Sequence, residues 1–237
     1  MPETVTAYVA AQVREAERPL IEAGVPLMAR AALVLARVTA GLLADASDRR
    51  VLVLAGGGDN GGDALFAAAH LLDGSMPVRA DGVDVLLAAS THHEAGLAAA
   101  VAAGARVVDP GQAIAATYDF VIDGLLGTGT RGAPALRGAV RDVVTRLVLE
   151  VVAGRLRVVA VDLPSGLHPD DGTSVDGLVL PASVTVTFGG VKAGLTRARG
   201  PELAGRIVLA DIGLRDALST VVPVGRTEVG EVVDYRA

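Results

Sequence analysis

The sequence has no cysteine and no tryptophan, and aromatic residues make up only 3% of its 237 residues. Without cysteine the chain has no disulfide, no thiolate metal site and no cysteine nucleophile, which fits a reducing, cytoplasmic environment. With so few aromatics, the core is expected to consist of Ala, Val, Leu and Ile. Because apolar residues reach 51%, the chain is too apolar to be disordered.

Basic residues are outnumbered, with 21 Lys and Arg against 27 Asp and Glu, a formal net charge of −6. This acidic balance argues against nucleic acid as the main partner. No run of about 18 uninterrupted apolar residues occurs, so no transmembrane helix is expected. Residues 1–4 form neither a basic nor an apolar region, so no signal peptide is expected. The length fits one large α/β domain.

Short β-branched runs alternate with Ala-rich segments from residue 50 onward. Strands with fully apolar runs alternating with helices are typical of a mostly parallel sheet that has helices on both faces. Two helices are expected to precede this region. The helices are predicted over 3–21, 27–46, 63–72, 93–103 and 134–151, and the strands over 51–54, 83–87, 106–108, 120–122, 158–161, 183–188 and 206–212.

Three of the predicted strands end in loops of Asp and small residues. In an open parallel sheet, ligands bind beyond the carboxyl ends of the strands. Three such loops in one chain are therefore stronger evidence for a site than one. The loops are 55–64 after the first strand, 123–132 after the fourth and 162–166 after the fifth.

The first loop contains Gly56-x-Gly58-x-x-Gly61, the pattern of a dinucleotide-binding turn. Glycines of this kind let backbone N–H groups approach a phosphate at a helix N-terminus. A conventional NAD site also needs an acidic residue about 20 positions on for the ribose, and the second strand ends without one. The motif alone fits a phosphate site and a tight strand-to-helix turn equally well.

Four aspartates, Asp59, Asp63, Asp123 and Asp162, are expected at this rim. Carboxylates near a phosphate repel it unless a cation or a proton intervenes. Asp63 can be read simply as a first-turn helix acid, whereas Asp123 and Asp162 end strands. Asn60, Asp123 and Ser165 form an oxygen-rich set suited to a hard cation. The small number of carboxylates favours a monovalent ion.

Other candidates have plainer alternatives. Asp162, Ser165 and His168 suggest a triad, but its members should converge from separate elements and no G-x-S-x-G elbow is present, so we reject it. Arg131 is either an anion contact or a solvated loop charge. Lys192 either approaches the site or covers a sheet edge, and we favour the site.

Taken together, these segments resemble the YjeF N-terminal domain family, the NAD(P)H-hydrate epimerases. Residues 56–64 read G-G-G-D-N-G-G-D-A, similar to the family's G-x-G-N-N-G-G-D-G. Asp59 stands where the family has Asn, and Ala64 where it has Gly. Further matches are 123–131 to D-x-L-x-G-x-G, 161–166 to D-x-P-S-G, 185–192 to T-x-T-F-x-x-x-K, and shorter ones at 27–28 and 211–213.

The resemblance implies a Rossmann-like three-layer α/β sandwich, often dimeric, that interconverts the R and S forms of hydrated NADH and NADPH. It implies one potassium ion per subunit, held by Asn60, Asp123 and Ser165. For such a reaction we predict Asp162 as the catalytic residue, because a carboxylate near the ring would stabilise a positive charge on it and move a proton. The implied substrate contacts are Asp59, Asn60, Gly61, Gly62, Asp63, Gly127, Thr128, Gly129, Thr130, Arg131, Gly132, Asp162 and Lys192.

The expected organisation is an epimerase-type domain over 1–218, including the helices of 3–46. Residues 219–237 are expected to be an irregular tail or the start of a linker to a further domain. A dehydratase for hydrated NAD(P)H, fused or separate, is the implied partner. The alternative functions are a dinucleotide-binding sensor or interaction module without epimerase activity and, less favoured, a hydride-transfer oxidoreductase.

Overall fold

The computed structural model describes residues 2–115, 117–129 and 135–237. Their strands form an eight-stranded sheet, ordered β11-β9-β7-β6-β5-β2-β3-β4, and a three-stranded sheet, ordered β10-β1-β8. Every strand pair in the large sheet is parallel. The expected α/β fold with a mostly parallel sheet is therefore confirmed.

The large sheet contains β2 (Arg50–Ala55), β3 (Gly82–Leu87), β4 (Arg106–Val107), β5 (Phe120–Gly124), β6 (Arg157–Val161), β7 (Val184–Phe188), β9 (Arg206–Asp211) and β11 (Glu231–Asp234). The small sheet contains β1 (Glu3–Tyr8), β8 (Val191–Lys192) and β10 (Gly225–Val229). The helices are α1 (Ala10–Glu22), α2 (Leu27–Leu43), α3 (Asp59–Leu72), α4 (Glu94–Ala102), α5 (Pro110–Ala115), α6 (Gly138–Val152), the 3-10 helix Ala193–Thr196, α7 (Gly200–Leu203) and α8 (Arg215–Ser219).

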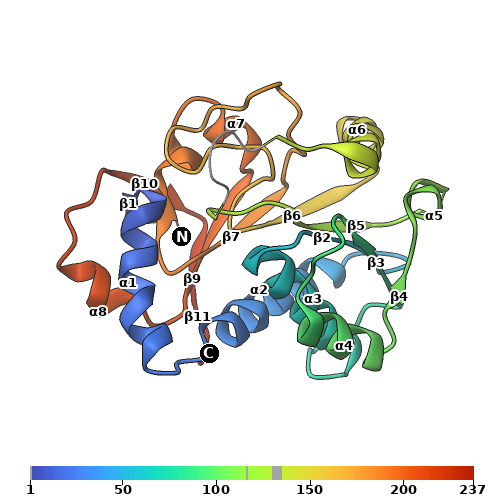
Figure 1. The fold of residues 1–237 in the computed structure, drawn as a ribbon, viewed down its shortest axis with the longest axis horizontal. Helices are drawn as coiled ribbons and strands as arrows, with labels where there is room; N and C mark the ends of the chain where they lie inside the picture. The colour runs from blue at the N-terminus through green and yellow to red at the C-terminus, as the bar shows by residue number, and fades with distance from the viewer. Residues whose placement is uncertain (1, 116, 130–134) are drawn as a thin grey trace.

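Helices cover both faces of the large sheet (Figure 1). In that view α2, α3 and α4 lie below the sheet and α6 lies above it. Buried Val, Leu and Ala side chains of α2, α3 and the strands form the lower core, and a smaller cluster including Val143 and Leu147 of α6 forms the upper one. Phe120 is the largest fully buried side chain, so aliphatic residues supply nearly all of the packing.

The strand order reverses beside β2. The chain moves outward through β3 and β4, then returns to place β5 on the other side of β2 and continues through β6 and β7. Crevices at such reversals, beyond the carboxyl ends of the strands, are the usual ligand sites of open α/β sheets. The loops after β2, β5 and β6 meet there.

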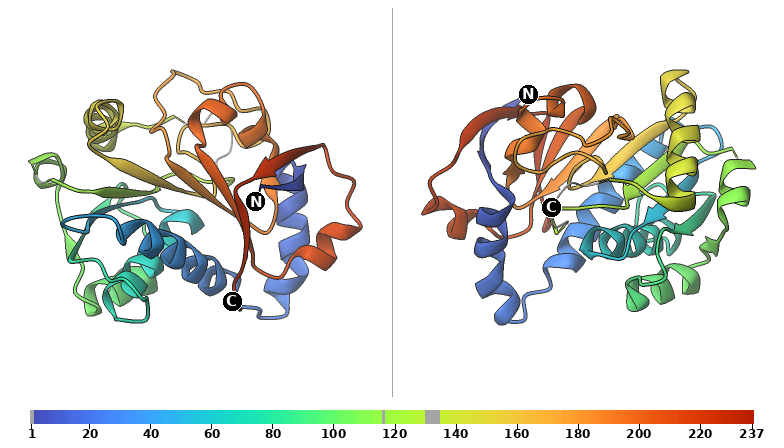
Figure 2. Two further views of the ribbon diagram at one scale, coloured as in Figure 1. Left: turned by 180° about the vertical axis from the view of Figure 1, so that it is seen from behind. Right: turned by 45° about the horizontal axis from the view of Figure 1, so that its top comes forward.

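The N-terminal segment differs from the predicted helix over 3–21. Residues 3–8 form β1, and α1 starts only at Ala10. β1 pairs antiparallel with β10 at the far end of the chain and parallel with β8 (Figure 2). The alternating Thr4, Val5 and Thr6 suit a strand, but only these distant partners satisfy its backbone groups.

The C-terminal segment also differs from the expected irregular tail. β10 pairs with β1, and β11 extends the large sheet by pairing with β9. Val229 is buried. Residues 225–234 are thus part of both sheets, because two edge strands supply unpaired backbone groups for them.

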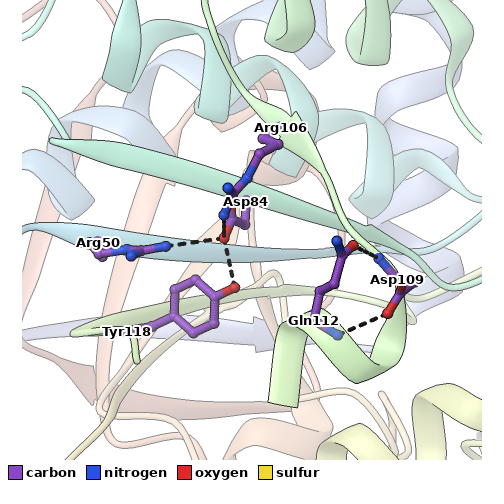
Figure 3. Close-up of polar contacts among 6 residues, drawn as sticks. All are labelled: Arg50, Asp84, Arg106, Asp109, Gln112 and Tyr118. Atoms are coloured by element: carbon purple, nitrogen blue, oxygen red, sulfur yellow. Dashed lines mark hydrogen bonds and ion pairs between the residues drawn. The ribbon is translucent and has the colours of Figure 1, made fainter. Parts of the chain in front are cut away.

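At the opposite, amino end of the sheet, the buried Asp84 pairs with two arginines that are not buried (Figure 3). Asp84 of β3 accepts hydrogen bonds from Arg106 of β4 at 2.9 Å, from the Tyr118 hydroxyl at 2.8 Å and from Arg50 of β2 at 3.3 Å. Although burial opposes it, the bonds from Arg106 and Tyr118 lower the pKa of Asp84. These partners make Asp84 a structural residue, not the ribose-binding acid of a conventional NAD site.

Among the described residues, no single helix is long and apolar enough to cross a membrane. Helices α1 and α2 reach the required length and composition only as a pair, which is bent by 117° at the break between them.

Candidate functional site

The first loop is shorter than predicted because α3 begins at Asp59 rather than at Asp63. Asp59, Asn60, Gly61 and Gly62 therefore form the first turn of a 14-residue helix. The first N–H groups of a helix lack partners within it and favour anions. Gly61 is required for packing: a Cβ there would lie 2.0 Å from the carbonyl oxygen of Gly56.

Asn60 connects this helix to the neighbouring strand ends. Its Nδ2 donates to the carbonyl oxygen of Val161 at 2.6 Å and, at 3.4 Å, to that of Leu126. With Nδ2 held by these carbonyls, Oδ1 remains available to accept a bond or to bind a cation. A Cβ at position 127 would lie 2.4 Å from that Oδ1, so the Asn60 amide can lie this close to the loop only because residue 127 is glycine.

Asp123 and Ser165 form a buried pair between β5 and the loop after β6. Ser165 donates from Oγ to Asp123 Oδ1 at 2.7 Å and from its backbone N–H to Oδ2 at 2.9 Å. Asp123 is fully buried and makes no ion pair with any described residue. Burial raises the pKa of Asp123, and the bonds from Ser165 oppose that rise. A buried carboxylate without a charged partner is suited to a bound cation.

These positions confirm the rejection of a catalytic triad. Ser165 is committed to Asp123 and also accepts a bond from the backbone N–H of Leu126 at 2.9 Å. His168 Nδ1 lies 3.2 Å from Asp171 instead of approaching Ser165.

Asp162 and Lys192 form a second buried pair. Lys192 is the only lysine in the sequence, is 2% exposed, and places Nζ 2.5 Å from Asp162 Oδ1. The same Oδ1 accepts bonds from the Thr187 hydroxyl at 3.0 Å and the Phe188 N–H at 3.1 Å. Oδ2 has no hydrogen bond to the described residues, so it is the oxygen available to a ligand. Lys192 belongs to β8, the edge strand of the small sheet, and its side chain is buried against Asp162.

Asp162 also has a backbone conformation that is rare for a residue with a side chain. Its φ is +68°, in the left-handed region. Such a conformation costs free energy and persists where the surrounding structure imposes it. Here the turn directs the carboxylate toward Lys192 at the end of β6.

Asp63 is not the exposed first-turn acid of the simpler interpretation. It lies in the second turn of α3, is 5% exposed, and its buried Oδ1 has no hydrogen-bond partner among the residues that the structure describes. Burial raises its pKa well above the usual value, and the nearby Asp162 and Asp59 raise it further. A neutral Asp63 is able to donate a hydrogen bond.

We expect Asp63→Asn to change the pH dependence of stability. A carboxyl with a raised pKa holds its proton longer in the folded state, so wild-type stability falls as the pH rises above about 3.9, the unfolded value. Asn carries no titrating proton and avoids this loss. The melting temperature of Asp63→Asn relative to wild type should therefore increase between pH 5 and pH 8. A difference that does not vary with pH would contradict the raised pKa.

Not every predicted contact can be placed. Gly127, Thr128 and Gly129 follow β5 at this edge of the sheet, whereas Thr130, Arg131 and Gly132 lie outside the described residues. Ala64, which replaces a glycine of the pattern, is fully buried, and a Cβ at Gly124 would lie 2.7 Å from its methyl group. That departure is accommodated by packing against β5.

The sequence analysis missed Glu17 of α1, which lines a cleft together with Asp59 and Asp63. It occurs on the same helix face as Val13, Ala16 and Leu20, at spacings of three and four. A glutamate on an otherwise apolar helix face was the feature of the sequence that could have indicated a site residue. The link to the site was not visible, since Lys192 and Asp162 are far away in sequence.

Comparison with known proteins agrees with this geometry. The family model for the YjeF-related protein N-terminus matches residues 24–194. The NAD(P)H-hydrate epimerase of Microbacterium testaceum is 52% identical over 93% of this chain and 84% of its own length. The NAD(P)H-hydrate epimerase of Clavibacter michiganensis subsp. michiganensis is 47% identical over 92% of this chain and 94% of its own length. The bifunctional NAD(P)H-hydrate repair enzyme Nnr of Mycobacterium tuberculosis is 37% identical over 92% of this chain and 43% of its own length.

The matched segment contains Asn60, Asp123, Asp162, Ser165 and Lys192, the residues that the structure brings together at the ends of β2, β5, β6 and β7. With the family model covering most of its length, the chain belongs to the family of the YjeF-related protein N-terminus.

Proposed function

We propose that this protein epimerises the R and S forms of hydrated NADH and NADPH, an isomerase reaction in nicotinamide cofactor repair. The observation that carries the proposal is the convergence of the three strand-end loops: Asn60 bonds to Val161, and Asp123 bonds to Ser165. The relatives named above, at up to 52% identity, are NAD(P)H-hydrate epimerases.

The reaction inverts one carbon, C6 of the reduced nicotinamide ring, which bears the hydroxyl group. Cleavage of the C6–O bond leaves a cation shared between C6 and the ring nitrogen. A carboxylate held nearby stabilises that charge and can move a proton. Asp162 fits this role, because its Oδ1 is held by Lys192, Thr187 and Phe188 while Oδ2 stays available.

The remainder of the substrate requires an anion site. The first turn of α3 and the glycine-rich loop after β5 offer backbone N–H groups for the phosphates. Asp59, Asn60, Gly61, Gly62, Asp63, Gly127, Thr128 and Gly129 are the described residues proposed to line the substrate. We also propose Thr130, Arg131 and Gly132 as substrate contacts, because they continue the glycine-rich loop that follows β5.

We propose potassium as the cation of the site, with Asn60, Asp123 and Ser165 as its protein ligands. All three supply oxygen, and the buried Asp123 has no other cationic partner among the described residues. Within the same part of the chain, no group of three or more His, Asp or Glu is placed to hold a metal ion, which favours a monovalent over a divalent ion. Bound there, the ion would neutralise acids that otherwise repel the phosphates.

The proposal extends to the surroundings of the enzyme. We propose that it works as a homodimer in the cytoplasm and passes one epimer to a hydrated-NAD(P)H dehydratase, fused or separate. The match to part of a bifunctional repair enzyme supports such a coupling. NADH and NADPH hydrates are both proposed as substrates.

The test is chromatographic separation of the R and S hydrates over time, with purified protein in KCl or in choline chloride. We expect rapid equilibration in KCl and a loss of rate in choline chloride. KCl should also raise the melting temperature, because a ligand that binds only the folded state stabilises it. Dinucleotide-dependent stabilisation without turnover would instead indicate a sensor module. Redox turnover of the nicotinamide would indicate a dehydrogenase.

A further inference from the structure

A cleft of about 310 Å³ lies within the usual size range of small-molecule sites. Phe188, one of its lining residues, connects it to the Asp162–Lys192 pair: its N–H donates to Asp162 Oδ1 at 3.1 Å, and its carbonyl accepts from Lys192 Nζ at 2.8 Å. One side is apolar and comes from α1, α2 and the end of β7. Its apolar lining is Ile21, Val25, Pro26, Leu27, Met28, Ala31, Phe188 and Ile212. Three carboxyl groups, from Glu17, Asp59 and Asp63, complete the lining. This combination suits a flat, largely apolar ring with polar substituents.

One of these carboxyl groups requires a partner that the protein does not provide. Asp63 is 5% exposed, and its Oδ1 makes no hydrogen bond with the described part of the chain. Buried polar atoms in native proteins are nearly always hydrogen-bonded to protein, water or ligand. The unpartnered oxygen of Asp63 therefore indicates that the cleft receives a polar ligand.

Glu17 is the least constrained acid of this cleft. It is half-buried and makes no hydrogen bond or ion pair with the described residues. On the same helix, Glu15 and Glu22 are exposed and pair with Arg18 at 3.3 and 3.2 Å. Partial burial of a carboxyl group without a partner costs free energy, so Glu17 does not stabilise α1.

Several charged groups face Glu17. Burial raises its pKa; Lys192 and, less strongly, Arg14 lower it, while Asp162 and Asp59 raise it. Asp63 is also close enough for Glu17 to raise its pKa. The net direction is upward, so Glu17 holds its proton more readily than an exposed glutamate does.

Inversion at C6 by exchange of the hydroxyl group needs proton transfer on both faces of the ring. We propose that Glu17 is the second catalytic acid–base residue of the epimerisation, acting on the ring face opposite Asp162. The assignment rests on the proposed function. It places the reduced nicotinamide ring in the cleft between Glu17 and the Asp162–Lys192 pair.

The step balances with water as its only co-reactant. The Glu17 carboxyl donates its proton to the C6 hydroxyl, the C6–O bond breaks with its electron pair leaving as water, and the ring nitrogen forms a double bond to C6. A water molecule on the other face adds its oxygen to C6 and gives a proton to Asp162. Glu17 is then ionised and Asp162 protonated, which is the state required for the reverse reaction.

The test compares Glu17→Gln with Glu15→Gln, a matched change on the exposed side of α1. We expect Glu17→Gln to lower kcat by about 10²–10⁴ with KM unchanged, and to remove one limb of the pH profile. Glu15→Gln should retain wild-type kinetics. In H₂¹⁸O, each wild-type inversion should incorporate one ¹⁸O atom at C6. Melting temperature and NADPH-dependent stabilisation report folding and binding of each variant.

Three results would overturn the assignment in a protein whose wild type is active. They are wild-type kcat in Glu17→Gln, a change confined to KM, and inversion that retains the original oxygen, as ring opening and closure would produce. An inactive wild type would refute the proposed function itself.

Discussion

Replacing Asp162 with asparagine is expected to lower kcat/KM for epimerisation by about 10²–10⁴. Asn keeps the size of the side chain and tolerates the left-handed backbone at φ +68° better than Ala. It can still accept from Thr187 and Phe188, but it has no negative charge to stabilise a ring cation or receive a proton. The rate of R/S equilibration measures the effect.

The same substitution leaves the ammonium group of Lys192 buried without its counter-charge. Removing one partner of a buried ion pair costs about 3–5 kcal/mol of stability. Adding Lys192→Met removes the unpaired charge, so the double variant should unfold at a higher urea concentration than Asp162→Asn. If stability were the only role of Asp162, the double variant would regain activity; we expect it to remain inactive.

Gly127→Ala is the second substitution with a large expected effect. Its Cβ would lie within 2.4–2.7 Å of three side-chain atoms of Asn60, which must then leave the Val161 carbonyl. A displacement of about 1 Å in a positioning group can cost about 10² in rate. We therefore expect a drop of about that size in kcat/KM and loss of the potassium-dependent rise in melting temperature.

Gly129→Ala is the matched control in the same loop. A Cβ at position 129 would meet no atom of the described residues within 4 Å, so this variant should keep the melting-temperature response to KCl. If Gly127→Ala kept the melting-temperature response to KCl, Asn60 would not be a ligand of the cation. Loss of the response in both variants would point to the loop backbone instead of the contact with Asn60.

The fold class and the site-forming loops were predictable from sequence for a geometric reason. Apolar, β-branched strands alternating with helices indicate a parallel sheet, and parallel strands place their carboxyl ends at one edge. Asp123 lies near the end of β5 and Asp162 directly follows β6, so both were expected at this edge. Potassium, the dimer and the substrate contacts remain predictions.

Other expectations failed where long-range pairing decides the structure. Residues 3–8 have the composition of either a helix or a strand, and pairing with the distant strands β8 and β10 makes them a strand. The segment after Val221 lacks a strong pattern, yet two sheet edges order it. Local propensity is a weak guide in such segments, because tertiary hydrogen bonding overrides it.

By itself, the sequence determined the mostly parallel α/β architecture and which loops of Asp and small residues follow the strands, because the hydrophobic pattern of each strand and helix is encoded locally. Only the tertiary structure decided the state of each acid. Asp63 is buried and unpartnered, Asp162 is held by the single lysine, and Glu17 reaches the same cleft from α1. Burial and neighbouring charge set what a carboxyl group can do, and both come from segments that are distant along the chain.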